Sequence, residues 1–350
     1  MIDNIWNYIK DGNPFSIAEA GVNHLGSLEL AERLIAGAKE SGATAIKFQS
    51  YKAKNLCTKN APRFWDWEGE VKEDGSQFDS YSLLDSFGEK EHLELKKICD
   101  KYDIEFMSTP FDNEATDYLD RIGTRIYKIA SCDITNFPLL EHVASKGKIV
   151  MLSTGAASLG EIKEAVSLVS RYTDKIVVMH CNLKYPTGDD EINLKMIEDI
   201  KREFGDKYVL GLSDHTMNML TPAFAYMLGA TVFERHFTID KTLDKSADHW
   251  LSADVREMST LIKNVNLARR MLGANNKKIC TASEERAKKY ARRSIVALKD
   301  IKKGEVLNHE NLACKRPGTG IPPKFYKEII GTKALKNIKE DTLLTLEDIF

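Results

Sequence analysis

Two histidines each end a short hydrophobic run, and their spacing suits a metal site. His215 closes the run that begins at Tyr208, and His236 closes the run that begins at Thr231. Each run reads as a buried strand, and residues 220–229 between them have a helical pattern. The carboxyl ends of successive parallel strands lie at one edge of a sheet. The two imidazoles should therefore converge and bind a divalent metal, with positions left open for water or substrate.

Polar side chains also stand where the other candidate strands end. Two lysines among them would be unfavourable to bury without anionic partners. With neighbouring hydroxyl groups they predict a pocket for phosphate or carboxylate oxygens, made by Lys47, Thr109, Lys128, Ser131, Ser153 and Ser213. Glu19 and Asp133 are candidate proton carriers, and Glu234 is a third candidate catalytic residue. An anion pocket beside an open metal site indicates carbon–carbon bond formation between a phosphorylated donor and an aldehyde.

A structural explanation exists for each of these residues taken singly. A serine or threonine at a strand end is more often the N-cap of the next helix, and a lone histidine is more often structural than a ligand. Eight strand ends that are all polar are hard to explain by capping alone. The pattern therefore favours a functional ring over a set of independent caps.

The elements that would position this ring alternate between β-rich runs and amphipathic helices. Candidate strands lie at 15–19, 43–48, 105–108, 125–129, 149–152, 176–180, 208–212 and 231–234. Candidate helices lie at 28–41, 90–102, 114–122, 159–170, 194–204, 220–229 and 255–272. Eight such units predict a (β/α)8 TIM barrel, in which the strand ends surround one pocket. A doubly wound open sheet is the alternative, but no G-x-G-x-x-G follows the first strand.

Three regions follow from this pattern. We expect a TIM-barrel catalytic domain at 1–273, a linker at 274–290 and a small β-rich domain at 291–350. The connection from residue 50 to residue 88 is too long for an ordinary loop, so we interpret it as a substrate lid, with an oligomer contact as the alternative. Residues 284–350 carry 15 Lys and Arg against 10 Asp and Glu. This excess of positive charge suits a domain that covers an anion-binding site, or one that simply pairs with an acidic surface.

Composition excludes several classes of protein. The net charge of −2 argues against nucleic acid as a partner. Six cysteines without a C-x-x-C pair indicate neither a disulfide framework nor a zinc ribbon, so we expect a reducing, cytoplasmic location. The N-terminus lacks the pattern of a signal peptide, and no apolar stretch approaches the roughly 20 residues that span a membrane. We therefore expect no membrane association.

The motifs resemble the sialic acid synthase family, which includes N-acetylneuraminate and legionaminic acid synthases. The matching segments are Ile17-Ala-Glu-Ala-Gly-Val-Asn-His24, Lys47-Phe-Gln49, Ser108-Thr-Pro-Phe-Asp112, Lys128-Ile-Ala-Ser131, Ser153-Thr-Gly155, Gly211-Leu-Ser-Asp-His215, Glu234-Arg-His-Phe237 and Asp248-His249. Beyond the barrel, Asp300-Ile-Lys-Lys-Gly304 and Lys315-Arg-Pro-Gly318 resemble the family's C-terminal antifreeze-like (SAF) domain. The resemblance covers nearly the whole chain, in order.

This resemblance implies condensation of phosphoenolpyruvate with an open-chain N-acetylmannosamine-type aldose and release of phosphate. It implies a divalent metal, usually Mn²⁺ with Mg²⁺ or Co²⁺ possible, held by His215 and His236. The phosphoenolpyruvate ligands would be Lys47, Thr109, Lys128, Ser131, Ser153, Asn182 and Ser213. The sugar ligands would be Gln49, Asp74, Tyr185, Asp248 and Arg316. The family also implies a domain-swapped homodimer, in which Arg316 reaches the partner's site.

The sequence departs from the family pattern near the expected sugar site. These departures are His180-Cys-Asn-Leu-Lys-Tyr-Pro186, Lys245-Ser-Ala-Asp248 and the loop that contains Trp65 and Trp67. The resemblance implies N-acetylmannosamine or its 2,4-diacetamido-2,4,6-trideoxy analogue, the legionaminic acid precursor, as the sugar, and Arg-Pro-Gly rather than Arg-Pro-Ser disfavours a pseudaminic acid synthase. Alternatives of another class are a metal-dependent aldolase, a synthase acting on a phosphorylated aldose, and a sugar-binding protein without activity.

Overall fold

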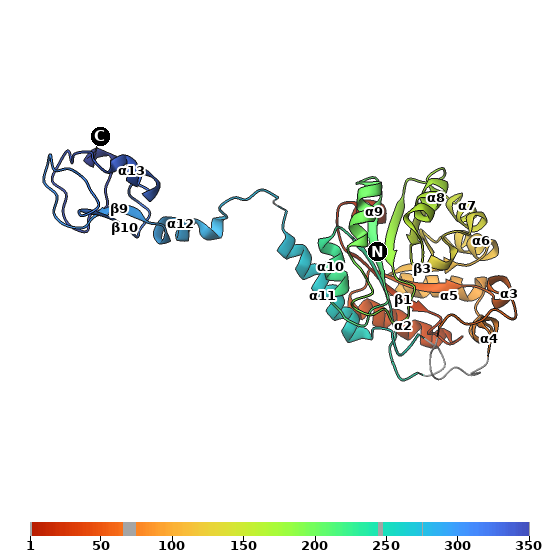
Figure 1. Ribbon diagram of the computed structural model, residues 1–350. Coiled ribbons are helices and arrows are strands. Elements are labelled where there is room, and N and C mark those ends of the chain that lie inside the picture. The colour runs from red at the N-terminus through yellow and green to blue at the C-terminus, as the bar shows by residue number, and fades with distance from the viewer. Residues whose placement is uncertain (1, 66–74, 244–247, 275, 350) are drawn as a thin grey trace. The chain divides into compact units, whose positions relative to one another are not determined.

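The chain forms two compact units, residues 1–273 and 274–350, which are described separately (Figure 1). The computed structural model describes residues 2–65, 75–243, 248–274 and 276–349. The boundary at 273 coincides with the end of the longest helix, where Gly273 takes a positive φ of 67°. Asp74 lies outside the described residues.

The first unit is a closed barrel of eight parallel strands in sequence order, with helices around it (Figure 1). The strands are β1 Phe15–Gly21, β2 Ala45–Ser50, β3 Glu105–Pro110, β4 Ile126–Ile129, β5 Ile149–Ser153, β6 Ile176–Cys181, β7 Val209–Asp214 and β8 Val232–His236. Strand β8 pairs with β1, which closes the ring and excludes the doubly wound open sheet. The predicted TIM barrel is confirmed.

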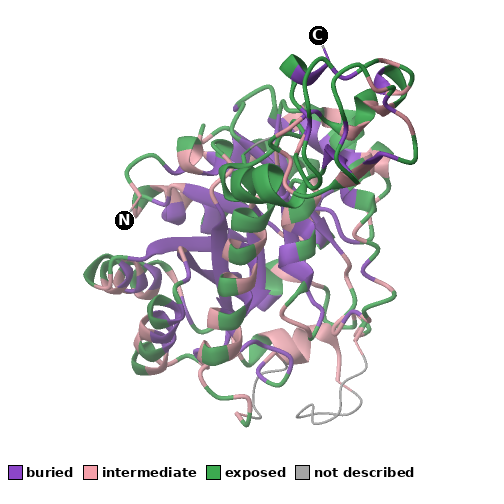
Figure 2. Cartoon of the chain, turned by 90° about the vertical axis from the view of Figure 1, so that its left-hand side faces the viewer, coloured by how far each residue is buried: buried purple, intermediate pink, exposed green. Residues whose placement is uncertain are grey.

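Helices cover the outside of the barrel, and each buries one face against the strands (Figure 2). The main ones are α2 Leu28–Ser41, α5 Glu89–Lys101, α6 Asn113–Arg121, α7 Phe137–Ala144, α8 Leu159–Val169, α9 Met196–Phe204, α10 Thr221–Met227 and α11 Val255–Leu272. Helix α2 shows why they form. Ser27 caps its first turn, Gly42 ends it with a φ of 89°, and Leu34 lies on its buried face. The sequence pattern missed α7, which is one short amphipathic helix.

All barrel strands except β4 extend one or two residues beyond their predicted carboxyl ends. The prediction ended each strand where polar residues begin. The structure continues the strand because alternate residues point into the barrel, and its interior changes from apolar to polar along the axis. One interior layer contains Ile17, Ala45, Met107, Ile126, Met151, Met179 and Val232. The next layer contains Glu19, Lys47, Thr109, Lys128, Ser153, Cys181, Ser213 and Glu234.

Three short helices complete the first unit. Helix α1 Ile5–Lys10 packs with apolar residues at the amino-terminal end of the barrel. Helices α3 Ala53–Leu56 and α4 Gln77–Ser82 lie within the long connection between β2 and α5, and they contact each other. The described parts of this connection line the cavity at the strand ends with Tyr51, Leu56, Phe64, Trp65 and Tyr81. The segment interpreted as a lid therefore forms a wall of that cavity.

The second unit has a core of its own. Strands β9 Ser294–Ala297 and β10 Leu312–Lys315 pair antiparallel, and apolar residues such as Ile295, Leu307 and Leu344 pack around them. Helix α12 Glu285–Ala291 precedes the strands inside the segment predicted as a linker, and α13 Tyr326–Ile329 follows them. The predicted β-rich C-terminal domain is therefore present.

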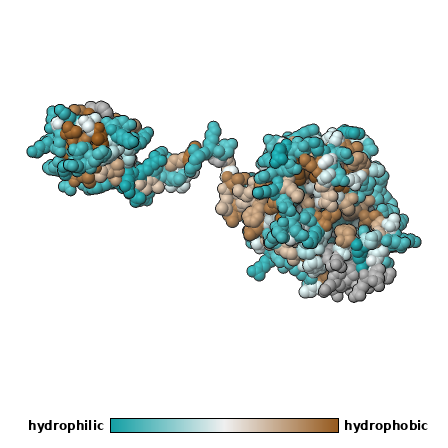
Figure 3. Space-filling model, viewed as in Figure 1, coloured by the Kyte–Doolittle hydropathy of each residue, from teal (hydrophilic) through white to brown (hydrophobic). Residues whose placement is uncertain are grey.

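The surface is mostly hydrophilic, with an apolar area where α11 leaves the barrel (Figure 3). Large exposed apolar side chains there and on α10 are Leu220, Phe224, Met227, Leu267 and Met271. Among the described helices, none combines the length and hydropathy that a membrane crossing requires. All six cysteines are free thiols.

We expect Leu34→Ala to lower the free energy of unfolding of the barrel by about 2–5 kcal/mol, because this fully buried side chain would leave a cavity under α2. Denaturant titration followed by tryptophan fluorescence measures this unit alone, since Trp6, Trp65, Trp67 and Trp250 all precede residue 273. Leu28→Ala on the same helix is the control, because Leu28 is 37% exposed. Equal effects of the two substitutions would contradict the packing of α2.

Candidate functional site

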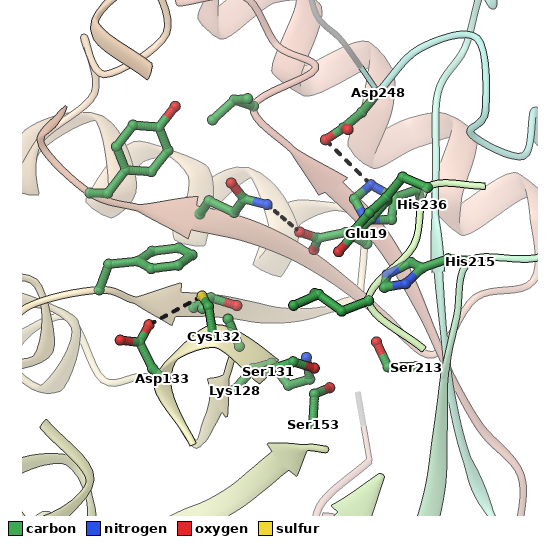
Figure 4. A pocket seen from close by; sticks show the side chains of 18 of the residues that line it. Glu19, Lys128, Ser131, Cys132, Asp133, Ser153, Ser213, His215, His236 and Asp248 are labelled. Carbon is green, nitrogen blue, oxygen red and sulfur yellow. Dashed lines mark hydrogen bonds and ion pairs between the residues drawn. The ribbon is translucent and has the colours of Figure 1, made fainter. Parts of the chain in front are cut away.

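A cavity of about 320 Å³ opens at the carboxyl ends of the barrel strands. The described part of the chain brings most of the predicted site residues to it: Glu19, Lys47, Gln49, Thr109, Lys128, Ser131, Asp133, Ser153, Tyr185, Ser213, His215, Glu234, His236 and Asp248. Figure 4 shows the two histidines and Asp248 on one side and Asp133 beside Cys132 on the other. Side chains from all eight strands or the turns after them therefore converge on one space.

Four buried charges form the floor of this cavity. The ammonium group of Lys47 lies 2.7 Å from Glu19 Oε2 and 3.8 Å from Glu234 Oε1. The ammonium group of Lys128 lies 3.2 Å from the same oxygen of Glu234. The expected anionic partners of the lysines are thus carboxylates of the protein itself. Two positive and two negative groups balance each other, which is the condition for keeping them out of water.

Parallel register places these partners opposite each other. Glu19 on β1 is level with Lys47 on β2, and it is also level with His236 on β8. Further hydrogen bonds orient the cluster: Lys47 donates to Thr109 Oγ1 at 2.9 Å, and Gln49 Nε2 donates to Glu19 Oε1 at 3.2 Å. The cluster is therefore held by strand pairing as well as by charge.

The two glutamates differ in ionisation. Burial raises the pKa of Glu19 to about 7, although the Lys47 charge acts in the other direction. Burial would also raise the pKa of Glu234, but the charges of Lys128 and Lys47 outweigh it and leave this pKa below its usual value. Glu234 is the fixed anion of the pair. Glu19 can hold or release a proton near neutral pH, which is the property that a proton carrier needs.

The two histidines are neutral and suitably oriented for a metal. Burial lowers the pKa of His215 to about 4, and burial also lowers the pKa of His236 well below its usual range. His215 Nδ1 lies 2.7 Å from the carbonyl oxygen of Asn182, which makes Nδ1 the donor and leaves the Nε2 lone pair free. The ring centroids of His215 and His236 are 5.5 Å apart.

Asp248 stands beside this histidine pair. Its Oδ2 lies 3.5 Å from His236 Nδ1, and burial raises the pKa of Asp248 to about 6. The Tyr185 ring covers His215, with centroids 3.9 Å apart. Among the described residues no group of three or more His, Cys, Asp or Glu side chains is arranged to hold a metal ion. Two neutral imidazoles suit a divalent metal that keeps open positions.

Several buried polar atoms in the cavity lack a partner within the described part of the chain. They are Tyr51 Oη, Ser153 Oγ and Glu234 Oε2, and His236 Nδ1 also makes no hydrogen bond, although it lies 3.5 Å from Asp248 Oδ2. Buried polar groups are almost always paired, so a group of orphans that all line one cavity indicates that a polar ligand or an ion completes them. Tyr51 was not predicted from sequence, because an aromatic residue after a strand reads as core.

Asn182, expected as a phosphoenolpyruvate ligand, lies away from the cavity in the structure. Its side chain donates to the carbonyl of Glu191 at 3.2 Å, and it does not line the cavity. Strand β6 continues to Cys181, so Cys181 takes the inward position and its sulfur lies 3.8 Å from His215 Nδ1. A count of alternate residues from Met179 would have identified Cys181. Arg316 belongs to the second unit, in the turn after β10.

Models of two known families match the chain. The NeuB family model matches residues 34–277, and the SAF domain model matches residues 292–349. The chain is 41% identical to N,N'-diacetyllegionaminic acid synthase of Campylobacter jejuni, over 94% of this chain and 98% of that protein. It is 33% identical to pseudaminic acid synthase of Helicobacter pylori, over 96% and 98% of the two chains.

A solved structure agrees with these matches. It is that of N-acetylneuraminic acid (sialic acid) synthetase from Leptospira borgpetersenii in complex with citrate. The TM-score is 0.69 at 39% identity, and the alignment covers 79% of this chain and 90% of that one.

Asn23 and His24, in the segment that follows β1, have structural roles. Asn23 Nδ2 donates to the Phe237 carbonyl at 3.0 Å and to Ser252 Oγ at 3.3 Å, and Ser252 Oγ donates to the carbonyl of Asp248. Asn23 thereby fixes the segment that carries Asp248. His24 stacks on Phe87 with centroids 4.0 Å apart, and burial lowers its pKa to about 3. His24 is therefore a neutral packing residue rather than a ligand.

We expect His24→Phe to make the stability of the barrel less sensitive to acid. Below pH 6.5 the unfolded chain binds a proton at His24 and the folded chain does not, so stability falls as pH falls towards 3. Between pH 7.5 and 5.5 the substitution should remove about 1.4 kcal/mol of this loss. Denaturant titrations at both pH values measure it, with His309→Phe in the second unit as control. Identical pH dependence in wild type and His24→Phe would refute the assignment.

Proposed function

Because the chain belongs to the NeuB family, we propose that it condenses phosphoenolpyruvate with the open-chain form of an N-acylated, mannosamine-type amino sugar and releases phosphate. The chain is an enzyme, a transferase of the nonulosonic acid synthase type. The observation that carries the proposal is the cavity itself, in which two lysines, an ionisable glutamate and two neutral histidines meet.

Phosphoenolpyruvate binds at the floor of the cavity. Lys47 and Lys128 face its phosphate and carboxylate, and the unpaired Ser153 Oγ donates to an oxygen of this anion. Both lysines are already neutralised by Glu19 and Glu234, so a multiply charged anion adds excess negative charge. Uptake of a proton by Glu19, whose pKa is raised to about 7, relieves this excess.

His215 and His236 would hold a divalent metal, and we propose Mn²⁺ from the resemblance to the sialic acid synthase family. When bound, the metal supplies Lewis-acid polarisation of the sugar aldehyde. The neutral state of both rings fits this assignment, as does the absence of a hydrogen bond to His236 Nδ1, whose nearest partner is Asp248 Oδ2 at 3.5 Å. Asp248 and Tyr185 stand at the same side of the cavity and orient the sugar hydroxyls.

The reaction then needs one carbon–carbon bond and one proton carrier. Carbon 3 of phosphoenolpyruvate attacks carbon 1 of the sugar, and water adds at carbon 2 of the former enol. The resulting tetrahedral centre expels phosphate by cleavage of its carbon–oxygen bond. Glu19, protonated when the anion binds, donates its proton to the oxygen at carbon 1 as the carbon–carbon bond forms. Its Oε2, held by Lys47, then accepts the proton of the attacking water, and the departing phosphate takes the hydroxyl proton of the tetrahedral centre. The burial of the cluster excludes other water from these steps.

The outer half of the cavity favours a sugar with apolar substituents. Tyr51, Leu56, Phe64, Trp65, Tyr81, Leu84 and Phe111 form its wall. Among the described lining residues the only cations are Lys47 and Lys128, both at the floor, so the described part of this wall offers a sugar phosphate no cation. The second candidate substrate, 2,4-diacetamido-2,4,6-trideoxymannose, has a methyl group and a second acetamido group that would pack on such a wall.

Phosphate release from phosphoenolpyruvate with a panel of free sugars tests the proposal. We expect turnover with 2,4-diacetamido-2,4,6-trideoxymannose or N-acetylmannosamine, and at least about tenfold lower kcat/KM with N-acetylmannosamine 6-phosphate, because its phosphate lacks a cation partner. His236→Ala should retain the fold by circular dichroism and lose turnover. No phosphate release with any sugar in the presence of Mn²⁺, or normal activity of His236→Ala, would refute it.

We also propose that two subunits share each site, as a domain-swapped dimer in which the second unit of one subunit places Arg316 at the partner's sugar. Two features support an association of subunits. The barrel exposes Phe224, Met227 and Met271 on α10 and α11, and the second unit has excess positive charge. Arg316 offers a guanidinium that suits an acyl oxygen.

Mixing two inactive variants tests the shared site. In the proposed arrangement a hybrid of a His236→Ala subunit and an Arg316→Ala subunit contains one intact site. Random mixing after denaturation and refolding should therefore restore about a quarter of wild-type activity, and each variant refolded alone should restore none. Failure of the mixture to regain activity, with sedimentation showing dimers, would refute the swapped arrangement.

A further inference from the structure

A buried ion pair links the two strands that carry the histidines. Asp214 and Arg235 are direct register partners on β7 and β8, and each immediately precedes one of the histidines. Arg235 Nη1 donates to Asp214 Oδ2 at 2.8 Å. Both side chains are almost completely buried, with exposures of 1% and 2%. Because side chains alternate along a strand, Asp214 and Arg235 point to the outside of the barrel, while His215 and His236 point into the cavity.

This pair occupies an otherwise apolar layer. The preceding outward residues on the same strands, Leu212 and Phe233, belong to the main hydrophobic core. Arg235 Nη2 has no hydrogen-bond partner among the described residues. A buried and incompletely paired arginine is unfavourable compared with apolar side chains of similar size, so stability alone does not account for it.

The contacts of Asp214 explain what the pair does. One carboxylate oxygen, Oδ1, accepts from the Thr216 backbone N–H at 2.9 Å, which closes a turn around His215. The other oxygen, Oδ2, holds Arg235, the residue before His236. Thr216 Oγ1 accepts from Arg235 at 3.3 Å and lies 3.0 Å from Thr221 Oγ1 in the first turn of α10. The Asp214 carboxylate therefore holds both the turn that contains His215 and the residue that precedes His236.

We propose that Asp214 and Arg235 are positioning residues, which hold His215 and His236 at the separation that a single divalent cation requires. The inference rests on the proposed role of the two histidines as metal ligands. A shift of β7 against β8 by one residue would turn His215 away from the cavity and separate it from His236, and the ion pair opposes this shift in a way that apolar side chains would not.

The test is the affinity of the full-length protein for Mn²⁺ alone, measured by isothermal titration calorimetry. The double variant Asp214→Leu/Arg235→Met replaces the pair with apolar side chains. We expect its melting temperature to be unchanged or higher, and its Mn²⁺ affinity to be about 10- to 100-fold weaker. Arg235→Lys, which keeps the charge but not the forked geometry, should bind with intermediate affinity.

The matched control is the pair Arg125–Glu105, which lies at the opposite end of the barrel, where β3 begins. Glu105→Leu/Arg125→Met should leave Mn²⁺ affinity unchanged. Wild-type affinity in the folded Asp214→Leu/Arg235→Met protein overturns the inference, as does a wild-type protein that binds no Mn²⁺. Phosphate release by the wild-type protein tests the proposed function separately: loss of metal affinity without any turnover would refute that function and leave the positioning role standing.

Discussion

The ion-pair cluster of Glu19, Lys47, Lys128 and Glu234 is the interaction on which the rest of the site depends. Its members come from β1, β2, β4 and β8, and all four are buried. None could remain charged there alone, so the closure of the barrel and the ionisation of the cavity are mutually dependent. The positive charges of the two lysines are matched by the two glutamates within the cluster itself.

Burial raises the pKa of the acidic side chain Glu19 in this cavity and lowers the pKa of the basic side chain His215. It raises the pKa of Glu19 to about 7 and lowers the pKa of His215 to about 4, so one physical cause leaves an ionisable carboxyl group and a neutral imidazole in the same cavity. The neighbouring lysines keep Glu234 ionised in the same surroundings. The ionisation of a buried glutamate in this cavity therefore depends on which charged side chains the neighbouring strands place beside it.

Much of the architecture was predictable from local signals. Helices α2 and α11 begin and end at the predicted residues, since Ser27 and Asp254 cap them and glycines end them. The predicted barrel and most of the ring residues were also found. The sequence places the carboxyl ends of all barrel strands except β4 one or two residues too early, because polar residues there resemble the end of a strand. Asn182 is predicted as a phosphoenolpyruvate ligand, but its side chain bonds the Glu191 carbonyl, and Cys181 and Tyr51, which the sequence does not predict, line the cavity.

The sequence by itself determined the periodicity of strands and helices, and with it which residues stand at the strand ends. Those patterns are local, since they depend on alternation within one strand and on caps within one turn. Only the tertiary structure decided that Glu19 pairs with Lys47, that Asp214 pairs with Arg235, and that the two histidines lie 5.5 Å apart. Register between strands sets these pairs, and it arises from the closure of the whole barrel.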